Sequence, residues 1–457
     1  MSVIDVDLAQ RAGVIRPLHG INKGPLAQGG LISLVEPQRA AGIPSLRLHD
    51  CQWPYPDVVD IHAIFRDERA DPGEPSSYDF ALTDEYLTEA KRTGAEIVYR
   101  LGESIEHGTV KRFVHPPRDP ARWAQACLGI IRHYNEGWAG GFHHGIRYWE
   151  IWNEPENRPA MWTGTEEEYL QLYRVVARAL KEARPALRLG GPAVGNLGRM
   201  EGTRLLPSEF VTRFLARCQQ ERLPLDFFSW HCYTADPEEL SKRAAAVRQL
   251  LDQHGFQGTE SHLNEWNYLP GNSWSGLSRK ATPGMRQSFE DQMAGATGAA
   301  FAAAALIGLQ EAPVDVCNFF HGELGMFGLF TGQGGSTPVW EAWRGFGQLV
   351  RLKDRLRLPL HPRPGLSLLG AIDPAQETAL LLAAFRPPEA GPSPRATPSR
   401  CRVEFRGLPA GRRYQIRPLS TLSSAVPPAA AGVVRTGGAV RFEVSFPSVV
   451  LLHLDPP

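Results

Sequence analysis

The sequence has no excess of charge of either sign. Lysine and arginine together number 49, aspartate and glutamate together also number 49, and the formal net charge of the 457-residue chain at pH 7 is zero. A chain without a net charge does not favour nucleic acid, an anionic membrane or another polyanion as a partner. The composition therefore excludes binding by bulk charge and is better suited to a neutral substrate.

Cysteine is scarce, and no two cysteines form a C-x-x-C pair. A chain of this length can bury a full-sized hydrophobic core and does not need disulfides to hold it together. We therefore expect all the cysteines to be reduced and buried. The six are Cys51, Cys127, Cys218, Cys232, Cys317 and Cys401.

Long apolar runs are also missing. The most apolar run, residues 294–309, is shorter than the ~18 residues that a membrane span requires and is rich in alanine and glycine. This composition predicts a tightly packed core helix. The first 20 residues carry four charged side chains and no apolar segment typical of a secretory signal, so a cytoplasmic location is expected.

Strand-like and helix-like segments alternate through most of the chain. Short β-branched and aromatic runs are separated by segments with helical spacing of apolar residues, which indicates a parallel sheet with crossover helices. Eight such units suggest an α/β fold closed into a (β/α)8 TIM barrel. The expected strands are residues 18–22, 45–49, 96–101, 145–154, 187–191, 226–231, 261–268 and 315–320.

The pattern changes after about residue 351. Helical spacing gives way to short apolar runs separated by loops rich in proline, glycine and serine. This is typical of an antiparallel β-sandwich. The chain is thus predicted to contain a catalytic barrel over residues 1–350 and an accessory sandwich over residues 351–457.

Two glutamates end predicted strands. Glu154 precedes Pro155, and Glu265 stands shortly before Pro270. In a TIM barrel the C-terminal ends of the strands carry the catalytic side chains. Glycoside hydrolysis needs two such carboxyl groups: about 5 Å apart they lead to retention of configuration, and at roughly 6.5–9.5 Å they lead to inversion. The sequence does not measure this separation.

Three further polar residues accompany the glutamates. Asn153, next to Glu154, can donate to a sugar hydroxyl beside the anomeric carbon. His231 and Tyr233, at the end of the predicted sixth strand, can hold the carboxylate of the nucleophile. An isolated Asn-Glu-Pro tripeptide is weak evidence, but two glutamates that each end a strand beside aromatic residues favour catalysis.

Other candidates have an alternative structural role. His49 ends the predicted second strand, where it can contact a ligand hydroxyl or bond to the backbone of a neighbouring strand. Trp53 and Trp266 lie near strand ends, where an indole can stack on a sugar or belong to the core. The pair at 143–144, two adjacent histidines, lacks the spacing of a metal site, so neither a metal nor a cofactor is expected.

Residues 149–156, Trp-Glu-Ile-Trp-Asn-Glu-Pro-Glu, together with residues 263–267, Leu-Asn-Glu-Trp-Asn, resemble glycoside hydrolase family 39. This is the β-xylosidase and α-L-iduronidase family of the large retaining (β/α)8 clan. The resemblance extends over roughly residues 18–343. Further similar stretches are residues 47–50, 64–67, 78–80, 83–85, 99–102, 131–135, 230–233 and 327–329.

The resemblance implies a retaining exo-glycosidase with Glu154 as acid/base and Glu265 as nucleophile. It also implies a β-sandwich after the barrel. The positions that it implies for substrate binding are Asn153, His231 and Tyr233 around the reacting sugar, His49 as a substrate-contacting histidine, and Glu323 as a late acidic residue of the subsite.

The sugar is less well defined than the mechanism, because the family includes xylosidases, iduronidases, galactosidases, glucosidases and arabinosidases. We expect a β-xylosidase-like activity on neutral glycosides or short oligosaccharides. The alternatives are an endo-acting enzyme, a hydrolase of another sugar, and a carbohydrate-binding protein without turnover. The sequence leaves open whether the chain forms a homo-oligomer.

Overall fold

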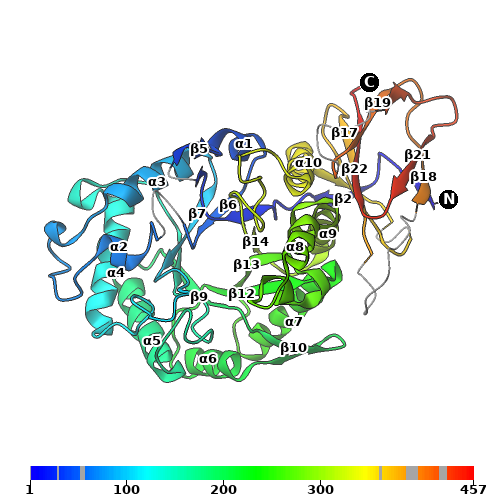
Figure 1. Cartoon of the computed structure of the whole chain (residues 1–457). Helices are drawn as coiled ribbons and strands as arrows, with labels where there is room; N and C mark the ends of the chain where they lie inside the picture. The colour runs from blue at the N-terminus through cyan, green and yellow to red at the C-terminus, as the bar shows by residue number, and fades with distance from the viewer. Residues whose placement is uncertain (1, 28–29, 52–56, 360–362, 387–399, 421–429) are drawn as a thin grey trace.

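The structure is a computed structural model that describes residues 2–27, 30–51, 57–359, 363–386, 400–420 and 430–457. Eight parallel strands close into a barrel surrounded by helices (Figure 1), which confirms the predicted TIM-barrel class. In order around the barrel the strands are β3 (Gly20–Asn22), β6 (Ser45–Leu48), β7 (Glu96–Leu101), β8 (Tyr148–Ile151), β9 (Arg188–Val194), β12 (Phe227–Thr234), β13 (Glu260–Tyr268) and β14 (Val316–Phe319).

The helices connect these strands and cover the outside of the barrel. The α5 helix shows why they form where they do: Thr165 and Glu168 make a reciprocal capping box, and the buried stripe faces the barrel. The helices are α1 (Val35–Ala40), α2 (Ile61–Ile64), α3 (Ala81–Arg92), α4 (Pro120–Glu136), α5 (Glu166–Ala183), α6 (Glu209–Gln220), α7 (Pro237–Gln253), α8 (Pro283–Ala294), α9 (Ala296–Gly308) and α10 (Pro338–Leu352).

Two short hairpins follow barrel strands: β4 (Leu26–Ala27) pairs with β5 (Ile32–Ser33), and β10 (Gly198–Glu201) pairs with β11 (Arg204–Pro207). The second hairpin projects from the rim of the barrel (Figure 1), and its first residue, Gly198, lines a cavity described below.

The apolar run of the sequence forms α9, which is almost wholly buried. This helix packs against β13 of the barrel and against β16, β17 and β22 of the second domain. Its alanines allow this close approach on two sides, as expected of a core helix. Among the described residues no single helix is long and apolar enough to cross a membrane; α8 and α9 together pass that test of length and composition only as a bent pair.

The second domain consists of two sheets that enclose their own core. The larger has the order β2-β15-β16-β17-β22-β19-β20 and the smaller the order β1-β18-β21. The strands are β1 (Ser2–Asp5), β2 (Arg11–Val14), β15 (Asp354–Leu356), β16 (Leu366–Ile372), β17 (Thr378–Ala384), β18 (Arg400–Arg406), β19 (Arg413–Pro418), β20 (Ala430–Val433), β21 (Val440–Ser445) and β22 (Ser448–Leu454).

The start of the chain departs from the predicted division, which assigned residues 1–350 to the barrel. Strand β1 pairs in parallel with β18, and β2 pairs with β15, so the N-terminus lies within the second domain (Figure 1). The alternating burial of β1 spans only four residues. A pattern this short does not reveal which sheet will receive the strand.

Candidate active site

The two predicted glutamates meet at the C-terminal end of the barrel. Glu265 is on β13, opposite His231 on the neighbouring strand β12. Glu154 follows the end of β8 and has a positive φ of 45°. One carboxylate oxygen of each glutamate and a ring nitrogen of His231 all lie within 4.8 Å of one another. Strand closure thus brings together residues that are far apart in the sequence.

His231 stands between the two carboxylates. Its Nδ1 is 2.7 Å from Oε1 of Glu154 and 2.7 Å from Oε2 of Glu265. A single N–H can donate fully to only one of them. Asn157 Nδ2 donates to the other oxygen of Glu154 at 2.9 Å. The glutamates therefore share one donor, and a ligand that enters between them can change how it is shared.

These contacts set the protonation of the cluster. Burial lowers the pKa of His231, but the two carboxylates outweigh it and raise this pKa to about 9. Burial raises the pKa of Glu265, although the charge of His231 opposes it. Burial acts in the same direction on Glu154, but there the hydrogen bond and charge of His231 prevail and lower the pKa.

Arg47 lies beneath the two glutamates and contacts Asn153 and Glu265. It was not among the predicted site residues. This fully buried guanidinium donates to Glu150 at 2.7 Å and to Oδ1 of Asn153 at 2.6 Å, and its Nη1 is 4.0 Å from Oε1 of Glu265. By accepting from Arg47, Asn153 is oriented with its Nδ2 group left to donate. An arginine between two leucines of a fully buried strand is the sequence signal that could have identified it.

His49 is buried on the same face of the barrel. Its Nδ1 accepts from Arg100 Nε at 3.2 Å, and its Nε2 is 3.4 Å from Asp50. Burial, together with the charges of Arg47 and Arg100, holds its pKa well below 6.5, so the ring is neutral. Its partner on the neighbouring strand β7 is thus a side chain, not the backbone bond that the sequence left as the alternative.

Glu323 lies beyond the end of β14, buried next to Lys23. Their charged atoms are 3.7 Å apart. Burial raises the pKa of Glu323 to about 7. Its Oε1 is buried and has no hydrogen-bond partner among the residues that the structure describes.

The aromatic residues predicted to bind substrate differ in burial and in the direction in which they point. Tyr233 is half-buried and makes an edge contact with the exposed Trp274 at 5.1 Å between ring centroids. Trp266 was predicted to bind substrate, and this is wrong: it is fully buried and packs on Phe301 of α9 and Trp343 of α10. Successive side chains of a strand alternate, so a residue next to the inward-facing Glu265 faces the helices. Trp53 lies outside the described residues.

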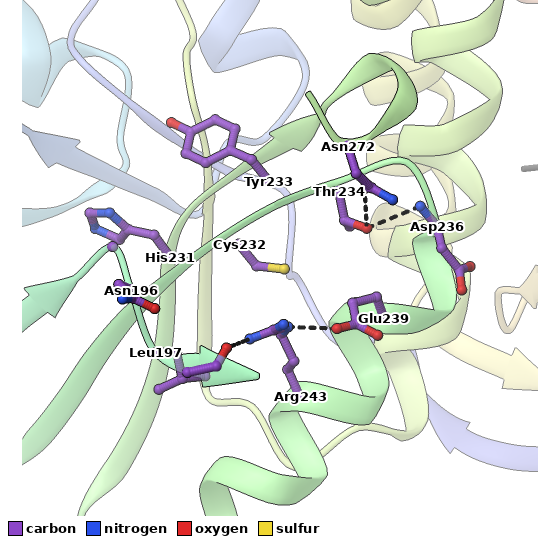
Figure 2. Close-up of a pocket in the computed structure, with 12 residues that line it drawn as sticks. Asn196, Leu197, His231, Cys232, Tyr233, Thr234, Asp236, Glu239, Arg243 and Asn272 are labelled. Carbon is purple, nitrogen blue, oxygen red and sulfur yellow. Dashed lines mark hydrogen bonds and ion pairs between the residues drawn. The ribbon is translucent and has the colours of Figure 1, made fainter. Parts of the chain in front are cut away.

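A cavity of about 490 Å³ opens beside His231 and Tyr233 (Figure 2). Its walls are formed by residues 195–198, which lead into β10, by the end of β12 and by the first turns of α7. Figure 2 shows Arg243 of α7 at its base, where Nε donates to Glu239 at 2.8 Å and Nη1 to the Gly198 carbonyl at 3.1 Å. Most of the lining side chains can donate or accept hydrogen bonds.

Comparison with known proteins gives a consistent family match. The family model described as "Glycosyl hydrolases family 39" matches residues 33–275. A curated relative, a β-xylosidase of Geobacillus stearothermophilus, is 30% identical over 240 residues, which cover 46% of this chain and 45% of that protein. The chain therefore matches about half the length of this relative.

Among the solved structures that match 100% of this chain, two illustrate the likeness. A glucosidase of Croceicoccus marinus is 24% identical, with 99% of that chain covered and a TM-score of 0.78. A monomeric β-xylosidase of Caulobacter crescentus CB15 is 19% identical, with 100% of that chain covered and a TM-score of 0.72. At these identities the likeness is one of fold.

Proposed function

The chain belongs to family 39 of the glycosyl hydrolases, and on that premise we propose that it is a retaining, exo-acting glycoside hydrolase of β-xylosides or related neutral glycosides and short oligosaccharides. The observation that carries the proposal is the separation of the two glutamates. Their nearest ligand atoms lie within 4.8 Å. Retaining enzymes have carboxyl groups about 5–5.5 Å apart, whereas inverting enzymes leave roughly 6.5–9.5 Å for a water molecule.

The proposed reaction has two displacements. In the first, a carboxylate oxygen of Glu265 forms a bond to the anomeric carbon while the bond to the leaving oxygen breaks, and Glu154 gives that oxygen its proton. In the second, Glu154 takes a proton from water, whose oxygen attacks the anomeric carbon and releases Glu265. Each displacement inverts the anomeric centre, so the two together retain its configuration.

Charge around the nucleophile supports these roles. Glu265 is the carboxylate nearer to a fixed cation, because Arg47 Nη1 is 4.0 Å from it. Glu154 has the more exposed side chain, at 16% against 6% for Glu265. A substrate that leaves the His231 N–H to Glu265 alone favours the ionised form of Glu265 and the protonated form of Glu154.

Asn153 supports transition-state binding. Arg47 occupies its Oδ1, so its Nδ2 can donate to the sugar hydroxyl beside the anomeric carbon. Such a bond strengthens as positive charge develops on the sugar ring. The β-xylosidase named among the relatives makes a xyloside our first choice of substrate.

The test is a panel of 4-nitrophenyl glycosides, with the native chain and the variants Glu265→Ala and Glu290→Ala. Glu290 is an exposed glutamate of α8 and serves as the matched control. We expect the native chain and the control to release nitrophenol from at least one glycoside, the β-xyloside first, with retained configuration by NMR. Glu265→Ala should be inactive until azide is added, and the azide product should have the inverted configuration. No turnover of any glycoside by the native chain would contradict the proposal, and azide rescue without inversion would remove Glu265 from the nucleophile role.

A further inference from the structure

A second cavity, a groove of about 1180 Å³, lies outside the active site. One wall consists of α2 and the residues that follow it, 65–69, and the other of residues 112–119 with the first turn of α4. Figure 1 shows α2 and α4 on the same side of the barrel. The two walls follow the barrel strands β6 and β7, so the groove lies at the same end of the barrel as the two glutamates. Neither glutamate lines it, and we refer to it as the rim groove.

The two walls of the rim groove are held in place by hydrogen bonds within the chain. Arg122 of α4 donates from Nη1 to the carbonyl of Arg69 at 3.1 Å, which ties one wall to the other. The carboxylate of Glu106 accepts from the backbone N–H groups of Arg112 at 2.8 Å and Phe113 at 3.1 Å. A preformed groove loses less free energy on binding than one that must first be ordered.

Part of the lining is apolar and open to solvent. The ring of Phe113 is 40% exposed and stacks on His62, with 3.5 Å between ring centroids and 4° between ring planes. Leu82, which is 41% exposed, also lines the groove, together with Pro116 and Pro117. Exposed apolar groups that gather in a groove mark a binding site. The C–H faces of a sugar ring can pack on such side chains.

The rim groove also carries a surplus of positive charge, although the chain as a whole has none. The side chains of Arg112 and Arg118 are exposed and have no partner among the described residues, and Glu68 is the lining acid in the same state. The other lining acids are engaged: Glu103 with His62, Asp67 with Arg69, and Asp119 with the first backbone N–H groups of α4. Two unpaired cations thus face one unpaired anion.

These features together select the occupant. Arginine binds carboxylates through parallel, charge-assisted hydrogen bonds, and Arg112 and Arg118 are unpaired. The volume exceeds the roughly 300–1,000 Å³ of a site for one small molecule, so it has room for several sugar units. We infer that the rim groove binds an acidic oligosaccharide, in which neutral sugar units carry uronate side groups. The choice of a sugar rests on the proposed function, which the inference extends from the bond that is cleaved to the kind of glycan that carries it.

The experiment measures Kd by titration calorimetry on the Glu265→Ala chain, so that the ligands are not hydrolysed. The ligands are xylotetraose with one glucuronate side group, unsubstituted xylotetraose, and tetraglutamate, which has carboxylates but no sugar. The test variant adds Arg112→Gln and Arg118→Gln to this chain. The control adds Arg435→Gln, because Arg435 is an exposed arginine of the second domain that does not line the groove.

We expect the acidic tetrasaccharide to bind about tenfold more tightly than the neutral one, through charge-assisted hydrogen bonds to the arginines. This preference should fall to about twofold or less in the test variant and should be unchanged in the control. It should also decline in 0.5 M NaCl, because the arginines are exposed. In the native chain, the acidic tetrasaccharide should not inhibit hydrolysis of a nitrophenyl xyloside more strongly than the neutral one, because the preference arises outside the active site.

The failures are distinguishable. Equal Kd values for the two tetrasaccharides, a preference that survives in the test variant, or tetraglutamate that binds as tightly as the acidic tetrasaccharide would overturn this inference and leave the proposed function standing. Stronger inhibition by the acidic tetrasaccharide would place its site at the glutamates and would also overturn the inference. A native chain that hydrolyses no glycoside but shows the expected preference would overturn the proposed function and leave the binding site in place.

Discussion

Among the described residues, two clusters each combine two acidic side chains with a histidine, and they differ in how the hydrogen bonds of their carboxylates are shared. Glu154, His231 and Glu265 form one, and Asp60, His62 and Glu103 form the other. Each brings two acidic groups and a histidine close enough to hold an ion. Both lie near the C-terminal ends of barrel strands, so composition and position do not distinguish them.

In the second cluster every carboxylate oxygen has a donor. Asp60 pairs with the buried Arg100 and accepts from Ser104 N at 2.7 Å and from its hydroxyl at 3.0 Å. Glu103 accepts from His62 N at 3.2 Å and is 2.5 Å from its Nδ1. These groups are neutralised by one another, and they hold Arg100 against His49. The carboxylate oxygens of this cluster are thus all satisfied without a ligand, while Nη1 of Arg100 is buried without a partner among the described residues.

The first cluster is incomplete. The Nδ1 of His231 is shared by Glu154 and Glu265, and its Nε2 is buried without a partner among the described residues. Buried polar groups are nearly always satisfied, so an exception in a cavity marks a place where a ligand supplies what is missing. The comparison teaches that one donor shared by two carboxylates, more than the residue types, distinguishes the first cluster from the second.

The two clusters should differ most in activity when one acid of each is neutralised. Glu265→Gln should lower kcat/KM on a nitrophenyl glycoside by about 10⁴-fold or more, because the attacking carboxylate is lost. Glu103→Gln should remain within about tenfold of the native chain, because among the described residues the hydrogen bonds of Glu103 go to His62, away from the two glutamates. Comparable losses in the two variants would show that the clusters do not differ in function.

Glu154→Ala should produce the next largest effect, and the effect should depend on the substrate. With a poor leaving group, which needs protonation, kcat/KM should fall by about 10²–10⁴-fold. With a good leaving group such as dinitrophenolate the loss should be smallest. A series of aryl glycosides of increasing leaving-group pKa measures this dependence. Equal losses along the series would remove Glu154 from the acid role.

The second cluster should matter more to stability. Asp60→Asn leaves Arg100 buried without its counter-charge, which should lower the free energy of unfolding by about 3–5 kcal/mol in urea titrations. The control Asp79→Asn breaks the exposed pair with Arg66, where the side chains are 46% and 67% exposed, and should cost less than about 1 kcal/mol. Similar losses in the two variants would contradict the structural role of the second cluster.

The smallest expected effect is on pH dependence. His231 has a folded-state pKa of about 9 against 6.5. Its charged form stabilises the fold fully below pH 6.5, and this contribution is lost as the pH rises through about 9. His231→Asn should make the free energy of unfolding depend less on pH between 6.5 and about 9. It should also remove the fall in kcat/KM that we expect in the native chain as His231 loses its proton over this range.

His62 provides the comparison for this titration. Burial lowers its pKa, but Glu103 and the nearby aspartates outweigh it and raise the pKa above 6.5. By the same sign rule, its stabilising contribution is present below pH 6.5 and declines above it. His62→Asn should therefore alter the pH dependence of stability and leave the profile of kcat/KM in place. A changed kinetic profile in this variant would contradict the contrast.

Much of the fold could be predicted because its signals are local. The alternation of strands and helices and the ends of strands at Pro155 and Pro270 are properties of short segments. The sequence was a poorer guide to which way a side chain points from its strand. Trp266, predicted to bind substrate, points to the helices, while Arg47, which was not predicted, points into the site. The pairing of β1 with β18 joins the two ends of the chain, and no local pattern specifies it.

The sequence by itself determined a barrel whose strand ends carry two glutamates, since a strand and its end are encoded by neighbouring residues. Only the tertiary structure decided that Glu154 and Glu265 lie within 4.8 Å and share the N–H of His231. Those distances depend on how three separate strands are placed when the barrel closes. A few ångströms in that placement distinguish retention from inversion, and such a difference leaves no trace in the local sequence.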